Sequence, residues 1–535
     1  MLQNQLAGRI PMPDPVRLHQ ILVNALLDPR RYPHPVERVT RIETHISTVL
    51  LAGAFAYKIK KPYDLGFLDF TTLAARRHYC EEELRLNRRF SPELYLAVLP
   101  ITGSHEDPHL GGEGPAIEYA LKMRRFPPGS LLSEAMARGE ISEAQIDALA
   151  CDVAALHQRI AVASPDTPWG MPTTLAAQAR QNVEQIQPLL GSDAQRRELQ
   201  ALARWTETEL ARLEPLIQRR KQEGFVRECH GDMHTGNMVV IDGRIRLFDC
   251  IEFNEAFRWI DVMSEVAFLV MDLASQGRPE LGWRFLNLYL EQTGDYPGVG
   301  VLRYYLVFRA VVRAKVAAFE AAQPGIEEHA RLKAWRRYEQ YMTLARRFQH
   351  AEPPLLIVMH GLSGSGKSTL AARLAERLGA IRLRSDVERK RLFGLKPLER
   401  STGQDIYTAE ATRRTYARLH GLAPVILAAG FTCILDATYL KKSERDAARQ
   451  AARDHAFVIL SCQAGKATLR ARVATRHAAG TDAAEADLRV LTLQSHWLEP
   501  PSADEPVLTV TTDSEIDLEG LIETLRARAG PTRLS

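Results

Sequence analysis

Cysteine is scarce in this chain, and long apolar runs are missing. None of the six cysteines forms a C-x-x-C pair, which argues against a disulfide framework and against a structural zinc site. No stretch of about 18 apolar residues is present to span a bilayer. The segment from Met1 to Pro15 lacks the basic and then apolar pattern of a signal peptide. We therefore expect a cytoplasmic protein with no membrane partner.

Positive and negative side chains are also nearly balanced, so the chain lacks a large excess of either charge. The formal net charge is only +4, with 45% apolar and 25% charged residues, an ordinary composition for a globular protein. Surfaces that bind nucleic acid are strongly basic, so this small net charge weighs against long nucleic acid as a partner. The length of 535 residues exceeds what one hydrophobic core supports, and more than one domain is expected.

A domain boundary is predicted near residue 350. A polar segment that ends in two prolines, 349–354, separates a basic helical stretch at 331–347 from an abrupt apolar run at 355–359. The predicted parts are an N-terminal domain, a linker and a C-terminal domain, at 1–348, 349–354 and 355–535.

The pattern of apolar segments differs between these parts. The N-terminal part begins strand-rich and then becomes mostly helical, with a hairpin around Asp242 and Gly243, which predicts an α+β fold. The C-terminal part alternates short strands with helices, which predicts a parallel sheet in an α/β fold. The expected strands lie at 44–51, 54–59 and 116–123 in the first part and at 355–360, 381–384, 432–436, 456–461 and 506–511 in the second.

The C-terminal part carries a nucleotide-binding motif. The pattern G-x-x-x-x-G-K-S/T follows an apolar strand and opens a helical stretch, as a P-loop does. Backbone N–H groups and the helix N-terminus would face the phosphates, while Lys367 reaches the β and γ phosphates and Ser368 binds Mg²⁺. The residues predicted to bind ATP are Gly361, Leu362, Ser363, Gly364, Ser365, Gly366, Lys367, Ser368 and Thr369.

Acids follow two later strands of this part, at the edge where ligands of parallel sheets bind. Asp386 and Arg389 share a helix face, where the acid can take the proton of an attacking hydroxyl and the arginine can hold an anion; otherwise Asp386 caps the helix. Asp436 is either a Walker-B acid that orients Mg²⁺ or a surface turn. Arg472 and Arg476 either close over the phosphates as a lid or form a solvated basic face.

These motifs together resemble the small P-loop kinases related to gluconate kinase and the polynucleotide 5′-kinases, over roughly residues 354–530. The likeness rests on the P-loop followed by L-R-S-D-x-x-R, I-L-D-A-T, L-R-A-R-x-x-x-R, D-A-A-E-A-D-L and Gln494. It implies phosphoryl transfer from ATP to a hydroxyl, with Asp386 as the base and Arg472 and Arg476 as lid arginines. Ala484 departs from the Ser or Asp that the family often has there, which affects the contacts of the lid.

The N-terminal part carries a second phosphotransfer motif, in the segment 230–237 with the sequence H-G-D-M-H-T-G-N. Its acid and its amide have the spacing of the kinase catalytic loop H-R-D-x-x-x-x-N. Asp232 is therefore predicted to accept the substrate proton, and Asn237 to bind a metal ion. The hairpin that follows returns Asp249 to the site, in the position of the metal-binding D-F-G acid.

This arrangement resembles the aminoglycoside and choline phosphotransferases, which share the protein-kinase-like fold, over about residues 35–345. The string L-F-D-C-I-E-F-N at 247–254 resembles one branch of that superfamily, whose members often carry a P-loop kinase domain behind. Two departures are visible. No G-x-G-x-x-G precedes the apolar strand at 54–59, so another loop must cover the phosphates, and Cys250 replaces the glycine of D-F-G.

The resemblance also implies a lysine that binds ATP phosphates and an acid that pairs with it. Lys58 in the apolar strand is the candidate, and Lys60 on the same face competes with it. Glu83 is the candidate partner acid, although Glu81 and Glu82 are adjacent. The strand at 116–123 would supply the adenine hinge.

Three further polar residues near the motif are expected to be structural. His230 and His234 lie in a loop without a third ligand of obvious spacing, which argues against zinc, and His230 is expected to brace the loop. Asp261 is expected to cap a helix or brace a loop.

The two motifs predict a bifunctional kinase that uses ATP and Mg²⁺ at each site and phosphorylates hydroxyl-bearing small molecules; a nucleic-acid 5′-end stays among the possible substrates. One alternative is a nucleotide-binding regulator in which only the P-loop domain is catalytic, but the retained Asp232, Asn237 and Asp249 speak against it. A mechanical ATPase would need further arginine fingers and a sensor region, for which a C-terminal domain of roughly 180 residues leaves little room.

Overall fold

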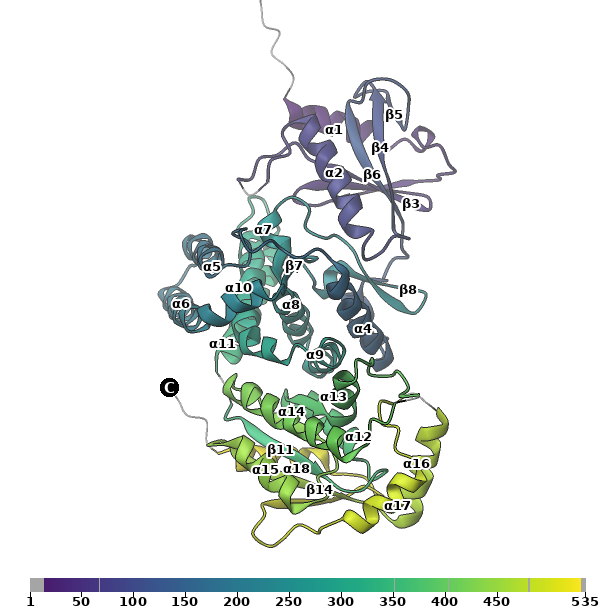
Figure 1. The fold of residues 1–535 in the computed structure, drawn as a ribbon. Helices are drawn as coiled ribbons and strands as arrows, with labels where there is room; N and C mark the ends of the chain where they lie inside the picture. The colour runs from purple at the N-terminus through teal and green to yellow at the C-terminus, as the bar shows by residue number, and fades with distance from the viewer. Residues whose placement is uncertain (1–13, 67, 351, 403, 480–481, 531–535) are drawn as a thin grey trace, which may run out of the picture. The chain divides into compact units, whose positions relative to one another are not determined.

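The computed structural model describes residues 14–66, 68–350, 352–402, 404–479 and 482–530 (Figure 1). Its packing divides the chain into two compact units, each made of two separate segments. The first unit joins Met1–Ile141 to Glu228–Ile260, and the second joins Ser142–Arg227 to Asp261–Ser535.

The first unit is built on a six-stranded antiparallel sheet with the strand order β1-β2-β3-β6-β4-β5. Leu22 of helix α1 and Leu26, the residue after the helix, pack against Leu50 and Ile59 of the sheet. The hairpin β8–β9 follows the catalytic-loop motif. The elements are α1 (Pro15–Ala25), η1 (Pro29–Arg31), β1 (Val39–Glu43), β2 (Ser47–Ala52), β3 (Phe55–Lys60), α2 (Leu73–Asn87), β4 (Tyr95–Gly103), β5 (Pro108–Leu110), β6 (Glu118–Arg124), α3 (Leu132–Ala137), η3 (Thr235–Asn237), β8 (Met238–Ile241), β9 (Arg244–Leu247) and α7 (Glu255–Arg258).

The second unit begins with helices, as the sequence predicts for this stretch. Among the described residues, no helix combines the length and the apolarity that crossing a bilayer requires. The short strands β7 (Val226–Glu228) and β10 (Trp259–Asp261) pair where the chain passes between the units. The helices are α4 (Glu143–Arg159), α5 (Pro172–Ile186), η2 (Gln187–Leu189), α6 (Asp193–Gln222), α8 (Val262–Ser275), α9 (Pro279–Thr293), η4 (Tyr296–Gly298), α10 (Val299–Ala321) and α11 (Glu328–Gln349).

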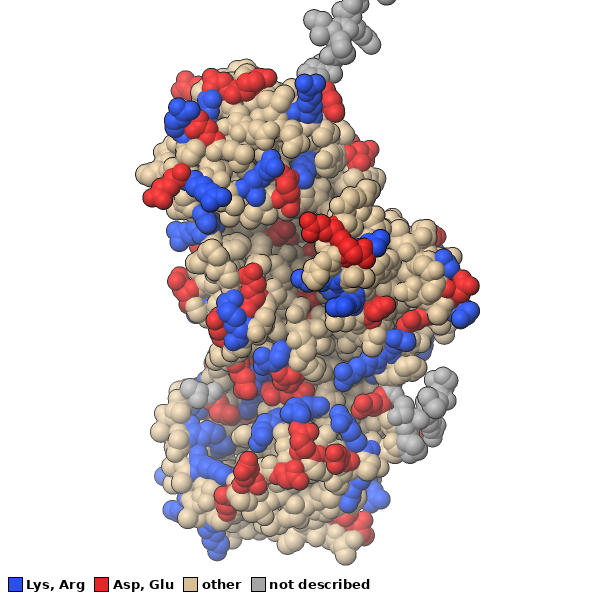
Figure 2. All heavy atoms as spheres, turned by 180° about the vertical axis from the view of Figure 1, so that it is seen from behind, with Lys and Arg blue, Asp and Glu red and all other residues tan. Residues whose placement is uncertain are grey.

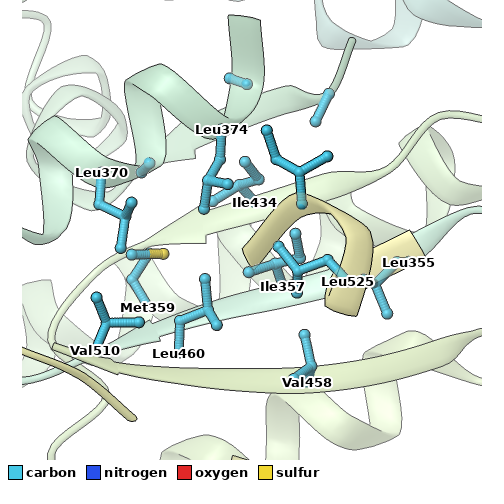
Figure 3. Close-up of a cluster of buried hydrophobic side chains, with 14 of the residues drawn as sticks. Leu355, Ile357, Met359, Leu370, Leu374, Ile434, Val458, Leu460, Val510 and Leu525 are labelled. Carbon is cyan, nitrogen blue, oxygen red and sulfur yellow. The ribbon is translucent and has the colours of Figure 1, made fainter. Parts of the chain in front are cut away.

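The rest of the second unit contains a five-stranded parallel sheet in the order β12-β13-β11-β14-β15. Alternate residues of β11 point into a core with α12 and α18 (Figure 3), where Ile357 and Met359 lie near Leu370 and Leu374. The elements are β11 (Leu355–His360), α12 (Lys367–Leu378), β12 (Ile381–Arg384), α13 (Ser385–Leu392), α14 (Ala409–Ala428), β13 (Cys433–Asp436), α15 (Lys442–Ala452), β14 (Ala456–Gln463), α16 (Lys466–Ala479), α17 (Leu488–Trp497), β15 (Val507–Thr511) and α18 (Leu518–Ala529).

The expected strands are present in both sheets, within a few residues of their predicted ends. The sequence did not predict β1, β4 and β5 of the antiparallel sheet. Strand β4 includes Pro100 and is mostly half-buried, so it lacks the clear alternation of apolar and polar residues by which a strand is recognised. The helix that begins at Lys367 and the hairpin around Asp242 are as predicted.

Candidate active sites

Strand β3 delivers two lysines to one buried cluster of acids in the first unit. Because Lys58 and Lys60 are two residues apart, their side chains leave the same face of the strand. The Nζ of Lys58 lies 2.7 Å from Glu83 Oε1 and 2.5 Å from Asp249 Oδ1. The Nζ of Lys60 lies 2.8 Å from Glu83 Oε2 and also donates to Glu252. Of the three adjacent acids of α2, the buried Glu83 is thus the partner of both lysines.

These charges stabilise one another. Burial by itself would lower the pKa of Lys58, but Asp249, Glu83 and Glu252 raise it well above its ordinary value. Burial would likewise raise the pKa of Glu83, but the two lysines lower it below its ordinary value. For Glu252, burial prevails and raises the pKa, although Lys60 opposes this. Both lysines are therefore cations at neutral pH.

Asp249 adopts a backbone conformation that few residues other than glycine adopt. Its φ angle is +63°, in the left-handed region. Two hydrogen bonds hold the chain there: the N–H of Asp249 donates to Tyr95 Oη over 2.9 Å, and the N–H of Cys250 donates to Asn87 Oδ1 over 2.9 Å. The Asp249 side chain remains 45% exposed, so a carboxylate oxygen is available to a cation. Strain of this kind is typical of functional sites.

The catalytic-loop motif forms a compact set of side chains. Asn237 Nδ2 donates to Asp232 Oδ2 over 2.7 Å, so the predicted base and the predicted metal-binding amide are in contact. His230 Nε2 donates to the carbonyl oxygen of Phe248 over 2.9 Å and thereby ties the loop to the hairpin. His234 lies 3.3 Å from Asp232 Oδ2 and accepts a backbone N–H of the loop. As expected from the sequence, His230 braces this loop.

Gly231 is the loop residue that tolerates substitution least, which gives a first prediction. Its φ is +88°, and a Cβ would lie 2.7 Å from the carbonyl oxygen of Phe257. We expect Gly231→Ala to destabilise the first unit by about 2 kcal/mol or more, since strain and steric overlap add, and to displace Asp232. Denaturant unfolding measures the first effect. Gly243→Ala is the matched control, because Gly243 also has a positive φ but has nothing near its Cβ; equal losses in the two variants would contradict the prediction.

The residues predicted to bind ATP in the C-terminal part form the connection from β11 to α12 and the first turn of that helix. Gly361 has a φ of +135°, and a Cβ there would lie 2.4 Å from the carbonyl oxygen of Cys462, so only glycine fits. The N–H of Ser363 donates to Gln494 Oε1 over 2.8 Å, which ties the loop to α17. Lys367 Nζ donates to the carbonyl oxygen of Leu362 over 2.7 Å.

Ser368 and Asp436 form a donor set that suits Mg²⁺. Ser368 Oγ lies 3.0 Å from Asp436 Oδ1, and hydroxyl and carboxylate oxygens are the ligands that Mg²⁺ prefers. Asp436 Oδ2 is buried and has no hydrogen-bond partner among the described residues, and burial raises the pKa of this carboxyl. Such an oxygen is stabilised by a cation. This geometry fits a divalent cation and does not fit a surface turn.

Lys367 lies within the electrostatic range of several predicted site residues. Burial lowers its pKa; Asp436 and Asp386 oppose this shift, and Arg476 adds to it. Lys367 therefore lies near enough to Asp436, Asp386 and Arg476 for their charges to act on its ammonium group. A bound phosphate would favour the charged form of Lys367.

The predicted arginines of this site make different contacts. Arg389 is buried, donates to the carbonyl oxygen of Ile406 over 3.1 Å and lies over the ring of Tyr407, and its anion-binding role stays a prediction. Arg472 donates to the carbonyl oxygen of Thr512 over 2.8 Å, beside the P-loop. Arg476 donates to the carbonyl oxygen of Ala486 over 3.2 Å. The lid role of Arg472 and Arg476 stays a prediction.

Two charged residues near these sites were not identified from the sequence. Glu252 contacts Lys60 in the first unit. It lies in the string L-F-D-C-I-E-F-N at 247–254, which could have indicated its place near the site. Arg384 precedes Asp386 by two residues, and its Nε lies 3.9 Å from Asp436 Oδ2. Asp261, expected to cap a helix, does cap α8: it accepts the N–H of Met263 over 2.8 Å.

Comparison with protein families agrees with this geometry. Residues 70–302 match the family described as the phosphotransferase enzyme family, and residues 356–501 match the AAA domain. Uncharacterized proteins of Mycobacterium tuberculosis and Mycobacterium bovis are 30% identical to the chain over 465 residues, which cover 85% of this chain and 90% of each relative.

Solved structures that align with parts of the chain include three kinases. A gluconokinase from Sinorhizobium meliloti is 24% identical over 34% of this chain and 93% of its own, with a TM-score of 0.24. A Plasmodium vivax ethanolamine kinase is 9% identical over 57% and 81%, with a TM-score of 0.36. Amicoumacin kinase, solved with AMP-PNP and Ca²⁺, is 13% identical over 61% and 93%, with a TM-score of 0.38. Since each TM-score is below 0.5, these likenesses support no further conclusion.

The family matches define an ATP-dependent kinase. Its N-terminal part has the aminoglycoside phosphotransferase-like variant of the protein-kinase-like fold, and its C-terminal part has a P-loop fold with a parallel sheet. The chain belongs to the same protein family as the mycobacterial proteins.

Proposed function

We propose that the chain is a bifunctional phosphotransferase with two sites for ATP and Mg²⁺, each of which phosphorylates a hydroxyl group of a small molecule. The observation that carries this proposal is that the predicted catalytic, metal-binding and phosphate-binding side chains of the N-terminal site are all present and in contact with one another in two groups. Lys58 Nζ lies within hydrogen-bond distance of both Glu83 and Asp249, and Asp232 contacts Asn237. A region that only senses nucleotide needs no general base, so the paired Asp232 favours catalysis.

At the N-terminal site, bound ATP with Mg²⁺ would supply a γ-phosphoryl group, whose bond to the bridging oxygen breaks as a bond to the substrate hydroxyl oxygen forms and ADP leaves. Asp232 would take the hydroxyl proton. Asn237 and Asp249 would hold the cation, and Lys58 would hold the α and β phosphates. Glu83 would keep Lys58 in place.

At the C-terminal site, the P-loop backbone and Lys367 would hold the phosphates, and Ser368 and Asp436 would hold the cation. Asp386 would take the proton of the second substrate, which is consistent with its half-buried position and its effect on Lys367. Arg472 and Arg476 would neutralise charge in the transition state.

The mild charge of the protein supports small molecules as the substrates. On the face in Figure 2, basic and acidic side chains are interspersed, as the net charge of +4 implies. A surface for long nucleic acid would be strongly basic. A nucleic-acid 5′-end needs only the reaction site, so it remains a substrate to test.

The number of ATP molecules bound per chain tests the proposal. We expect titration calorimetry with a non-hydrolysable ATP analogue and Mg²⁺ to give about two per chain, one for each phosphate-binding lysine. Lys367→Ala and Lys58→Ala should each reduce this to about one, because each removes a phosphate-binding cation from one site.

The double variant, Lys58→Ala with Lys367→Ala, should bind none. Lys396→Ala is a control, because Lys396 lies outside both predicted sites. The parent chain could instead bind one ATP, with this binding lost in Lys367→Ala and kept in Lys58→Ala. That result would show that the N-terminal site does not bind the nucleotide.

A further inference from the structure

One face of α9 lies along the edge of the parallel sheet within the second unit. Strand β12 is at that edge, so its outer backbone groups have no strand partner. Asn287 supplies one: its Nδ2 donates to the carbonyl oxygen of Ala380 over 3.0 Å, and its Oδ1 accepts the N–H of Arg382 over 2.7 Å. Trp283, one turn earlier on α9, packs against Gly379. The helix therefore fixes the strand that leads into Asp386.

Glu291 continues the same face one turn after Asn287. Its two carboxylate oxygens lie 2.7 Å from Arg382 Nη2 and 3.4 Å from Arg384 Nη1. Glu291 is only 4% exposed, and Arg382 and Arg384 are 9% and 13% exposed. Because charges in such surroundings interact strongly, this carboxylate stabilises the Arg382 guanidinium and, together with Asp482, that of Arg384.

Both arginines reach the P-loop site. Arg382 Nη1 donates to the carbonyl oxygen of Ser368 over 3.2 Å. Arg384 Nη2 lies 3.1 Å from Asp482 Oδ1, and its Nε lies 3.9 Å from Asp436 Oδ2. That oxygen of Asp436 is the buried one without a hydrogen bond. Arg384 therefore pairs with Glu291 and Asp482 and also lies near Asp436, the predicted ligand of Mg²⁺.

We propose that Glu291 is a positioning residue for the P-loop site: it holds Arg384 back from Asp436, so that the carboxylate stays available to Mg²⁺. This inference rests on the proposed role of Asp436 in binding Mg²⁺. It makes the P-loop site dependent on a helix that precedes residue 350. Without the Glu291 carboxylate, Arg384 moves closer to Asp436 and competes with the cation, because both are positive.

The test compares Glu291→Gln with the parent, both in an Asp249→Asn background that removes the metal-binding acid of the other site. The Mg²⁺ dependence of binding of a non-hydrolysable ATP analogue is measured by calorimetry. We expect an apparent Mg²⁺ affinity about tenfold weaker in Glu291→Gln, a usual cost of losing an outer contact of a metal site. Adding Arg384→Gln should restore the affinity, which a merely structural role of Glu291 would not explain. Amide exchange over 381–389 in the nucleotide-free chain should also become faster.

The control is Glu280→Gln on the same helix, whose carboxylate pairs with Arg278; it should behave as the parent. The inference is overturned if the parent and Glu291→Gln have equal Mg²⁺ affinity and equal amide exchange. If both still bind the analogue in a way that requires Lys367, the proposed function stands. If the parent shows no binding that depends on Lys367, the proposed function of this site is wrong, and the inference that rests on it fails too.

Discussion

Asp232→Asn is expected to abolish one phosphorylated product and to leave the other unchanged. Loss of a positioned general base lowers a rate by about 10²–10⁴-fold. Asparagine has nearly the shape of aspartate and can still contact Asn237, which lies 2.7 Å from the carboxylate, so ATP binding should be kept. The measurement is turnover of γ-labelled ATP against a pooled library of hydroxyl-bearing metabolites, with Lys367→Ala run in parallel to abolish the second product.

Asp242→Asn provides a matched control for this prediction. Asp242 lies at the exposed turn of the following hairpin, with a positive φ that asparagine tolerates well, so both products should persist. If Lys367→Ala removes all transfer and Asp232→Asn removes none, the N-terminal part is a binding or regulatory module and the proposal of two kinases is half wrong.

The two phosphotransfer motifs could be predicted because their chemistry is local in sequence. The segment 230–237 and the P-loop at 361–369 each place their polar groups within a few residues, so spacing alone indicates which side chains meet. The structure confirms the contact between Asp232 and Asn237 and the position of Lys367 at the start of α12. Their catalytic roles remain predictions, since geometry shows proximity and not turnover.

Contacts between distant segments could not be derived in this way. Glu291 and Arg384 are 93 residues apart, and an arginine or a glutamate at such a position is ordinary in any surface helix. Arg389 is a related case. Its spacing from Asp386 places both residues in one helix, as α13 does, but spacing does not indicate that the guanidinium packs against Ile406 and Tyr407. Helical periodicity indicates a face, and only the tertiary structure shows what covers that face.

The choice between Lys58 and Lys60 could not be made from the sequence, because both occupy one face of one strand. The structure distinguishes them by their partners. Lys58 pairs with Asp249, whose side chain is 45% exposed. The Lys60 side chain is only 1% exposed, and its ion pairs within the described residues are with the buried acids Glu83 and Glu252. Lys58 thus faces the predicted metal-binding acid, and Lys60 lies behind it. The function of Lys58 is expected to be catalytic and that of Lys60 to be structural.

Methionine substitutions separate these roles, because methionine keeps most of the side-chain volume. Lys58→Met should lower kcat for the N-terminal product by about 10²-fold or more, through loss of charge stabilisation on the phosphates. It should cost less stability than Lys60→Met does, because Glu83 keeps Lys60 as a partner and Asp249 is partly solvated. Turnover assays and denaturant unfolding of the same preparations give both values.

Lys60→Met should instead destabilise the first unit by about 3–5 kcal/mol, since Glu252 would be left as a buried charge without its partner. Adding Glu252→Gln removes that charge, so the double variant should recover stability and, with it, the N-terminal product. This rescue distinguishes a structural ion pair from a phosphate ligand. If the rescued double variant is folded but forms no N-terminal product, while Lys58→Met still forms it, Lys60 is the lysine that binds ATP.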